Sequence, residues 1–85
     1  MNQQIAQWYE QQTGLNATQG AQRINNIEAF LQAHGVTLND VEIYTRNIND
    51  KYTYRPLAAR PDRVKIGSTS HTSKKGTEYY VQIKR

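Results

Sequence analysis

The chain has 85 residues, a length that suits one small domain, and its 11 Lys and Arg against 7 Asp and Glu give a formal net charge of +4. It contains no cysteine, which excludes disulfides and thiolate ligands. Its first residues have neither the basic start nor the apolar run of a secretory signal, and no stretch approaches the ~20 apolar residues of a membrane span. We therefore expect a cytoplasmic protein.

The first predicted helix runs over residues 2–13, with Asn2 as its N-cap and Gly14 as the left-handed residue after its end. Its apolar residues have the i, i+3, i+4 spacing of a single helix face: Ile5, Trp8 and Tyr9. A second, longer helix is predicted from about Ala17 to His34, with Gly35 ending it. Its apolar stripe recurs every three or four residues, with Phe30 beside it: Ala17, Ala21, Ile24, Ile27 and Leu31.

The second half of the chain predicts strands. Residues 41–46 alternate between apolar and polar side chains, and residues 52–55 are expected to return as the second strand of a hairpin that Pro56 ends. A second hairpin is predicted over residues 61–85, with two alternating segments around a polar loop from Gly67 to Gly76. We therefore predict a single α+β domain over residues 1–85, with two N-terminal helices packed on an antiparallel sheet of three to four strands.

The charge is divided unevenly along the chain. Residues 1–40 hold one basic side chain against three acidic ones, a net charge of −2. Residues 41–85 hold ten against four, a net charge of +6. Such a division indicates a cationic surface directed at an anionic partner. The alternative interpretation is that the basic side chains keep a small domain in solution.

Alternation along the C-terminal hairpin assigns its side chains to two faces. Val64 and Ile66 share an apolar face with Tyr79, Val81 and Ile83, so we expect this face to be buried. The opposite face is expected to meet solvent and to carry Arg63, Lys65, Tyr80 and Lys84. Tyrosines that lie beside Arg and Lys on a sheet are able to stack on nucleobases, although tyrosine is also a common strand residue that half buries its ring.

The loop from Gly67 to Gly76 is rich in hydroxyl groups and carries Lys74 and Lys75, a combination suited to holding phosphate. The alternative is a solvated hairpin loop. His71 lies in this loop beside serines, but no carboxylate lies close in sequence to orient it, so we do not expect an enzyme. Two His without Cys, and scattered acidic residues, match no metal-ligand spacing, so we expect no metal or cofactor.

These patterns favour a small basic module that contacts the phosphate backbone of DNA or RNA through a cationic sheet face and the loop. The candidate contact residues are Arg55, Arg63, Lys65, Lys74, Lys75, Tyr80 and Lys84. The second hypothesis is an inhibitor or adaptor of the kind that phages and other mobile elements encode, docking on a partner protein. An exposed Trp8 would favour this second hypothesis, and a buried Trp8 with a continuous cationic face would favour the first.

Overall fold

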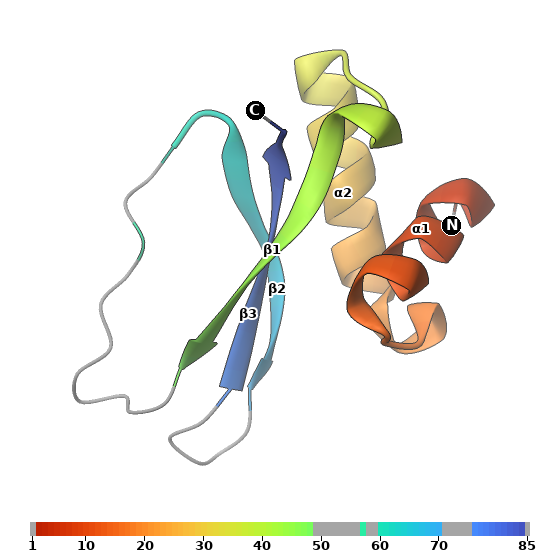
Figure 1. The fold of residues 1–85 in the computed structure, drawn as a ribbon. Coiled ribbons are helices and arrows are strands. Elements are labelled where there is room, and N and C mark those ends of the chain that lie inside the picture. The colour runs from red at the N-terminus through yellow and green to blue at the C-terminus, as the bar shows by residue number, and fades with distance from the viewer. Residues whose placement is uncertain (1, 49–56, 58–59, 71–75, 85) are drawn as a thin grey trace.

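Two helices lie against one face of a three-stranded sheet in the computed structural model, which describes residues 2–48, 57, 60–70 and 76–84 (Figure 1). The predicted α+β fold class is confirmed. The elements follow in the order α1 (Gln3–Thr13), the 3-10 turn η1 (Ala17–Gly20), α2 (Ala21–His34), the 3-10 turn η2 (Leu38–Asp40), β1 (Val41–Ile48), β2 (Arg63–Ser70) and β3 (Gly76–Ile83).

Local polar groups and glycines set the ends of the helices. The Oδ1 atom of Asn2 accepts hydrogen bonds from two backbone N–H groups in the first turn of α1, at 2.9 and 3.2 Å. Gly14 and Gly35 follow the two helices with φ of 72° and 63°, a left-handed conformation that glycine adopts without steric cost. The helix predicted from Ala17 is divided, because its first turn is η1 and the regular α-helix begins at Ala21.

The sheet has the order β1-β3-β2, so the last strand in the chain is the central one and runs antiparallel to both neighbours. β1 and β3 pair in one continuous register from Val41↔Ile83 to Ile48↔Gly76. The register between β2 and β3 shifts between Lys65 and Gly67, which leaves Ile66 as a bulge. The predicted C-terminal hairpin is confirmed, but the burial predicted for Val64 is wrong, because this residue is 42% exposed. The return strand expected over residues 52–55 lies outside the described residues.

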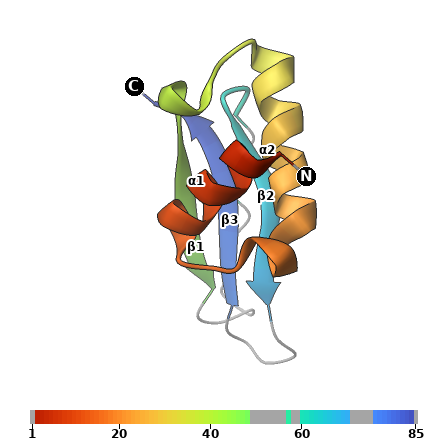
Figure 2. The ribbon, with the colours of Figure 1, turned by 90° about the vertical axis from the view of Figure 1, so that its right-hand side faces the viewer.

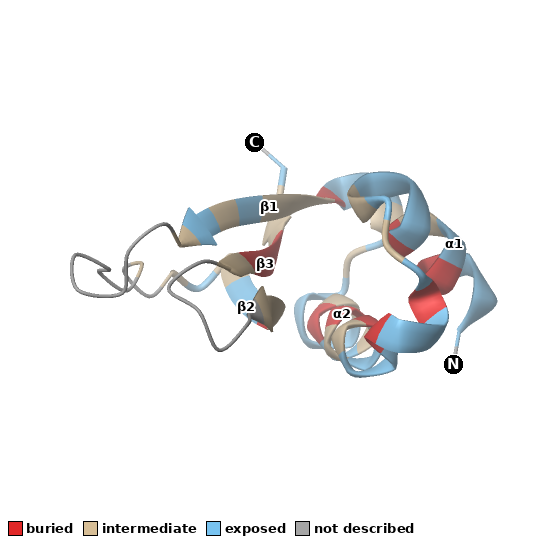
Figure 3. Ribbon diagram, turned by 90° about the horizontal axis from the view of Figure 1, so that it is seen from below, coloured by how far each residue is buried: buried red, intermediate tan, exposed pale blue. Residues whose placement is uncertain are grey.

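The core lies between the helices and the inner face of the sheet, the face that is turned towards them (Figure 3). α2 packs along β2, and α1 crosses the inner face of the sheet in front of β1 (Figure 2). The stripe predicted for the second helix is confirmed at Ile24 and Ile27 and is wrong at Ala21, which is exposed. Phe30 is buried with them, because the helix face turned to the sheet is centred on Ile27.

The start of α2 fits closely against α1. A Cβ atom on Gly20 would lie 2.7 Å from the hydroxyl oxygen of Tyr9, so the absent side chain leaves room for the Tyr9 ring. Trp8 is half-buried and packs against the core. Its exposure is intermediate, so it favours neither the hypothesis that required an exposed Trp8 nor the one that required a buried Trp8.

Candidate nucleic-acid interface

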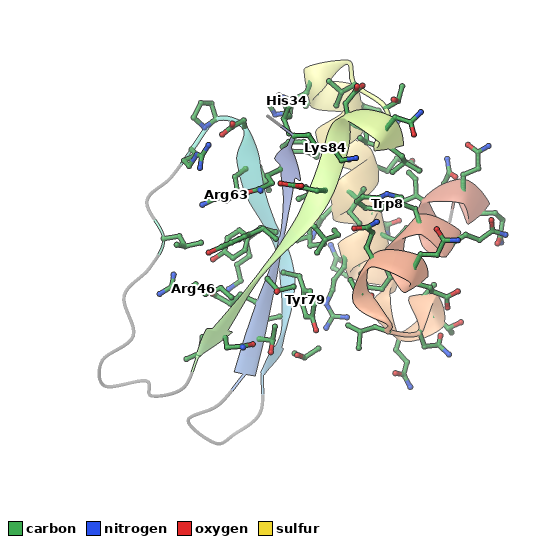
Figure 4. The ribbon with its side chains drawn as sticks, in the orientation of Figure 1. Trp8, His34, Arg46, Arg63, Tyr79 and Lys84 are labelled. Atoms are coloured by element: carbon green, nitrogen blue, oxygen red, sulfur yellow. The ribbon has the colours of Figure 1, made fainter. Side chains whose placement is uncertain are left out.

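The outer face of the sheet, which points away from the helices, carries the candidate residues that the structure describes within its strands. Figure 4 shows Arg46 and Arg63 on this side and Tyr79 on the helix side. Strand pairing arranges the outer face in four rows that each cross the sheet. From the C-terminal end of β3 to its start, the rows are Glu42–Gln82–Arg63, Tyr44–Tyr80–Lys65, Arg46–Glu78–Ser68 and Ile48–Gly76–Ser70.

The first row is a hydrogen-bonded chain across all three strands. The Nε atom of Arg63 donates to Oε1 of Gln82 at 2.8 Å, and Nε2 of Gln82 donates to Oε2 of Glu42 at 2.6 Å. The guanidinium of Arg63 also lies over the ring of Tyr44, with its Cζ atom 4.6 Å from the ring centroid. Arg63 is therefore held in place by neighbours on both sides.

Glu78 is the middle residue of the row Arg46–Glu78–Ser68, and it is buried, with 2% of its surface exposed. Its Oε2 atom lies 3.1 Å from Nζ of Lys65, and its Oε1 atom lies 3.9 Å from Nη1 of Arg46. The hydroxyl of Tyr80 donates to the same Oε1 atom at 3.0 Å. Burial of an ionised carboxylate is costly unless it is paired and hydrogen-bonded, and these three neighbours meet that requirement.

The charges on the outer face nearly cancel within the described strands. Three cationic side chains stand against two carboxylates, Glu42 and Glu78, which leaves a single net positive charge. Of the +6 net charge in residues 41–85, +4 belongs to residues outside the described part: five bases against Asp50. The expected cationic surface is thus interrupted by carboxylates where the structure describes it.

The candidate residues have different outcomes. Arg63 and Lys65 lie on the outer face, as predicted. Tyr80 lies on that face too, but its predicted exposure is wrong, because the residue is 7% exposed and its ring packs 5.9 Å from that of Tyr44. Lys84 follows the end of β3 and is exposed, with its N–H bonded to the carbonyl of Asp40 at 2.8 Å.

The polar loop is shorter than the sequence indicated. β2 extends to Ser70 and β3 begins at Gly76, so Gly67 to Ser70 are strand residues that pair with β3 instead of loop residues. The sequence pattern missed this because its apolar alternation stops at Ile66, where the bulge lies. Arg55, Lys74, Lys75 and His71 lie outside the described residues.

Two outer-face residues that carry the geometry, Arg46 and Glu78, were not among the candidates. Alternation places both on the polar side of their strands, so the sequence alone predicts which face each residue occupies. The pairing Arg46↔Glu78 joins strands separated by 32 positions, and alternation within one strand does not reveal such a pair.

The described residues also bear on catalysis, metals and membranes. His34 is exposed at the end of α2, where its ring stacks on that of Phe30 with centroids 4.2 Å apart. Across the described ranges, no cluster of three or more His, Asp or Glu side chains is placed to hold a metal ion. Neither α1 nor α2 has the length and apolar character needed to cross a bilayer.

Comparison of the chain with protein families, with curated proteins and with solved structures found no match.

Proposed function

We propose that the protein is a binding module, not an enzyme, and that it contacts the phosphate backbone of nucleic acid through the outer side of its sheet. The observation that carries the proposal is the separation of charge by layer. The helices and their turns, residues 1–40, have a net charge of −2, and residues 41–85, which include the three strands, have a net charge of +6 (Figure 1). The helices cover one sheet face, and the cations described within the strands, Arg46, Arg63 and Lys65, lie on the opposite face, which orients an anionic partner.

We propose that most of the phosphate contacts are made from one end of the sheet. Ile48, Ser70 and Gly76 lie together at that end, because each is the last or first residue of a paired strand. The two chain connections that leave from this end carry Lys51, Arg55, Lys74 and Lys75 in sequence. We assign most of the phosphate contacts to these side chains, with Arg63 and Lys65 in support.

The contact chemistry follows from how the described cations are held. Lys65 has 49% of its side chain exposed, so it is able to reach a phosphate while its ammonium stays near Glu78. Arg63 is fixed by Gln82 and Tyr44, which leaves its Nη groups as donors. Buried Tyr80 is not available to stack a base, so we propose backbone contacts with weak sequence preference.

The salt dependence of binding tests this function. Each phosphate contact to a duplex contributes roughly −0.9 to the log–log slope of the binding constant against salt. Replacing both loop lysines, Lys74→Gln with Lys75→Gln, should flatten the slope by about two units and weaken binding to all sequences alike. The matched control, Gln3→Glu with Gln11→Glu, makes the same change in net charge on exposed positions of α1. It should leave the slope nearly unchanged.

Gel retardation and fluorescence anisotropy with duplex DNA, single-stranded DNA and RNA would supply these slopes. If folded wild-type protein retards none of them at low salt, the nucleic-acid proposal is wrong. If the control pair flattens the slope as much as the lysine pair, binding responds to net charge and not to this end of the sheet.

The near-neutral outer face favours a second candidate, an inhibitor or adaptor that docks on another protein. Polar networks such as Glu42–Gln82–Arg63 present donors and acceptors in fixed positions, which suits recognition of a protein surface. This candidate takes precedence if nucleic acid is not bound. It then predicts that charge reversal at Arg63 weakens capture of the partner while the melting temperature stays close to wild type.

A further inference from the structure

The two edges of the sheet are protected differently. Along the β2 edge, Nδ2 of Asn26 donates to the carbonyl of Ile66 at 2.8 Å, and Nη2 of Arg23 donates to the carbonyl of Ser68 at 2.9 Å. The bulge at Ile66 also bends this strand. Side chains of α2 therefore occupy carbonyls that a further strand would need, and the β2 edge is closed.

The β1 edge has none of these protections within the described residues. β1 pairs with β3 through eight consecutive residues without a register shift, and it contains no proline. Within the described ranges, no hydrogen bond reaches the β1 backbone from the side away from β3. Figure 2 shows β1 at the border of the sheet, with α1 in front of it and no described element beside it. A long, regular edge of this kind is a template for another strand.

The sequence of β1 is complementary to itself when it is reversed. In an antiparallel pairing centred on Tyr44, the outer-face residue Glu42 stands opposite Arg46 of the second strand, and Arg46 stands opposite Glu42. Shifting the centre to Ile43 or Thr45 removes both charge pairs. Opposite charges directly across two antiparallel strands are stabilising, so one register is favoured over its neighbours.

We propose that β1 pairs with β1 of a second copy of this chain about a two-fold axis at Tyr44. The two sheets of three strands then join into one continuous sheet of six. The interface is isologous: the two Tyr44 residues face each other across the axis, and a Glu42–Arg46 pair lies on each side. The proposal is independent of the nucleic-acid function, although the dimer would double the cationic surface that a long anionic partner meets.

Charge reversal with rescue tests the pairing in the full chain. Glu42→Lys places an ammonium opposite Arg46 twice in a homodimer, and Arg46→Glu places two carboxylates opposite each other twice. Each variant alone should weaken dimerisation about tenfold or more. In the heterodimer that forms in an equimolar mixture, each of the two pairs across the axis again joins a cation to an anion. One pair consists of the original Glu42 and Arg46, and the other consists of the two introduced side chains. The heterodimer should therefore form with an affinity close to wild type. Sedimentation velocity over a concentration series measures all three samples.

Glu28→Lys is the matched control, because it makes the same charge change on α2, away from β1. It should leave the dissociation constant of the dimer unchanged. If wild-type protein remains monomeric at high micromolar concentration, or if mixing the two variants restores nothing, the proposal is overturned. A monomer in which residues 52–55 are protected from hydrogen exchange would identify that segment as the occupant of the edge instead.

A second measurement covers the case in which Arg46→Glu does not fold, since it places a carboxylate near Glu78. Thr45 is exposed, and the chain has no cysteine, so Thr45→Cys takes a single nitroxide label. Strand geometry places the two labelled Cα atoms about 8 Å apart in the proposed dimer. The spectrum should be broadened by spin–spin coupling, and an excess of unlabelled protein should remove the broadening. An unbroadened spectrum at dimer-forming concentration contradicts the register.

Discussion

The two faces of the sheet are both partly closed to water, but by different means. The inner face is closed by apolar side chains, with Ile66 and Val81 at 1% and 0% exposure. The outer face closes over a tyrosine and a carboxylate, Tyr80 and Glu78, which are joined by a hydrogen bond. The difference shows that alternation along a strand assigns a residue to a face without determining its exposure. Exposure on the outer face depends on which side chains the neighbouring strands supply.

The largest expected effect breaks the inner face. Ile27 is fully buried in α2, and Ile27→Asp would place a carboxylate there without a partner. Burying such a group costs several kcal/mol, which is comparable to the stability of about 5 kcal/mol expected for so small a domain. The variant should be largely unfolded by circular dichroism, and a cooperative melt near that of wild type would show that this helix face does not hold the core.

Removing the buried carboxylate breaks the outer face. Glu78→Ala takes away the oxygen that accepts from the Tyr80 hydroxyl and the anion that pairs with the Lys65 ammonium. We expect a loss of about 1–3 kcal/mol in the free energy of unfolding, at the lower end because Lys65 remains partly solvated. Glu42→Ala is the matched control on the same face, where a half-buried carboxylate accepts one bond from Gln82, and it should cost less than about 1 kcal/mol. Urea denaturation compares the two, and equal losses would contradict a central role for Glu78.

The smallest effect separates two adjacent tyrosines. Tyr80→Phe removes the hydroxyl that donates to Glu78, so it should cost about 1 kcal/mol. Tyr79→Phe is its matched partner on the inner face, and no hydrogen bond of its hydroxyl is described. It should be close to neutral in the same urea denaturation. If Tyr79→Phe lost more unfolding free energy than Tyr80→Phe, the hydrogen bond from Tyr80 to Glu78 would not be a source of stability.

The sequence was sufficient where a local pattern carries the structure. The helix caps at Asn2, Gly14 and Gly35 lie within one turn of the ends that they mark, and the alternation of β1 and β3 identifies their faces. It was not sufficient for the bulge at Ile66, where the period of two is interrupted and β2 continues past the expected loop start at Gly67. A break in alternation resembles the end of a strand when the partner strand is unknown.

The candidate site depended more heavily on pairing between distant residues. Sequence alternation placed Arg63, Lys65 and Tyr80 on one face, and the structure agrees. It did not predict that Tyr80 is buried, because that follows from Tyr44 standing directly opposite on β1. Nor did it predict the neutralising role of Glu78, which lies 13 positions from Lys65 and faces Arg46 across the sheet.

The central position of β3 has a consequence for the order in which the protein is made and folded. Both outer strands find their backbone partners in β3, and β1 and β2 do not pair with each other. During synthesis, α1, α2 and β1 emerge first, but the described sheet of β1, β3 and β2 is complete only when residues up to Ile83 are available. The apolar face of the helices therefore remains exposed to water until the sheet has formed. This requirement, together with pairings between residues as distant as Val41 and Ile83, favours slow folding.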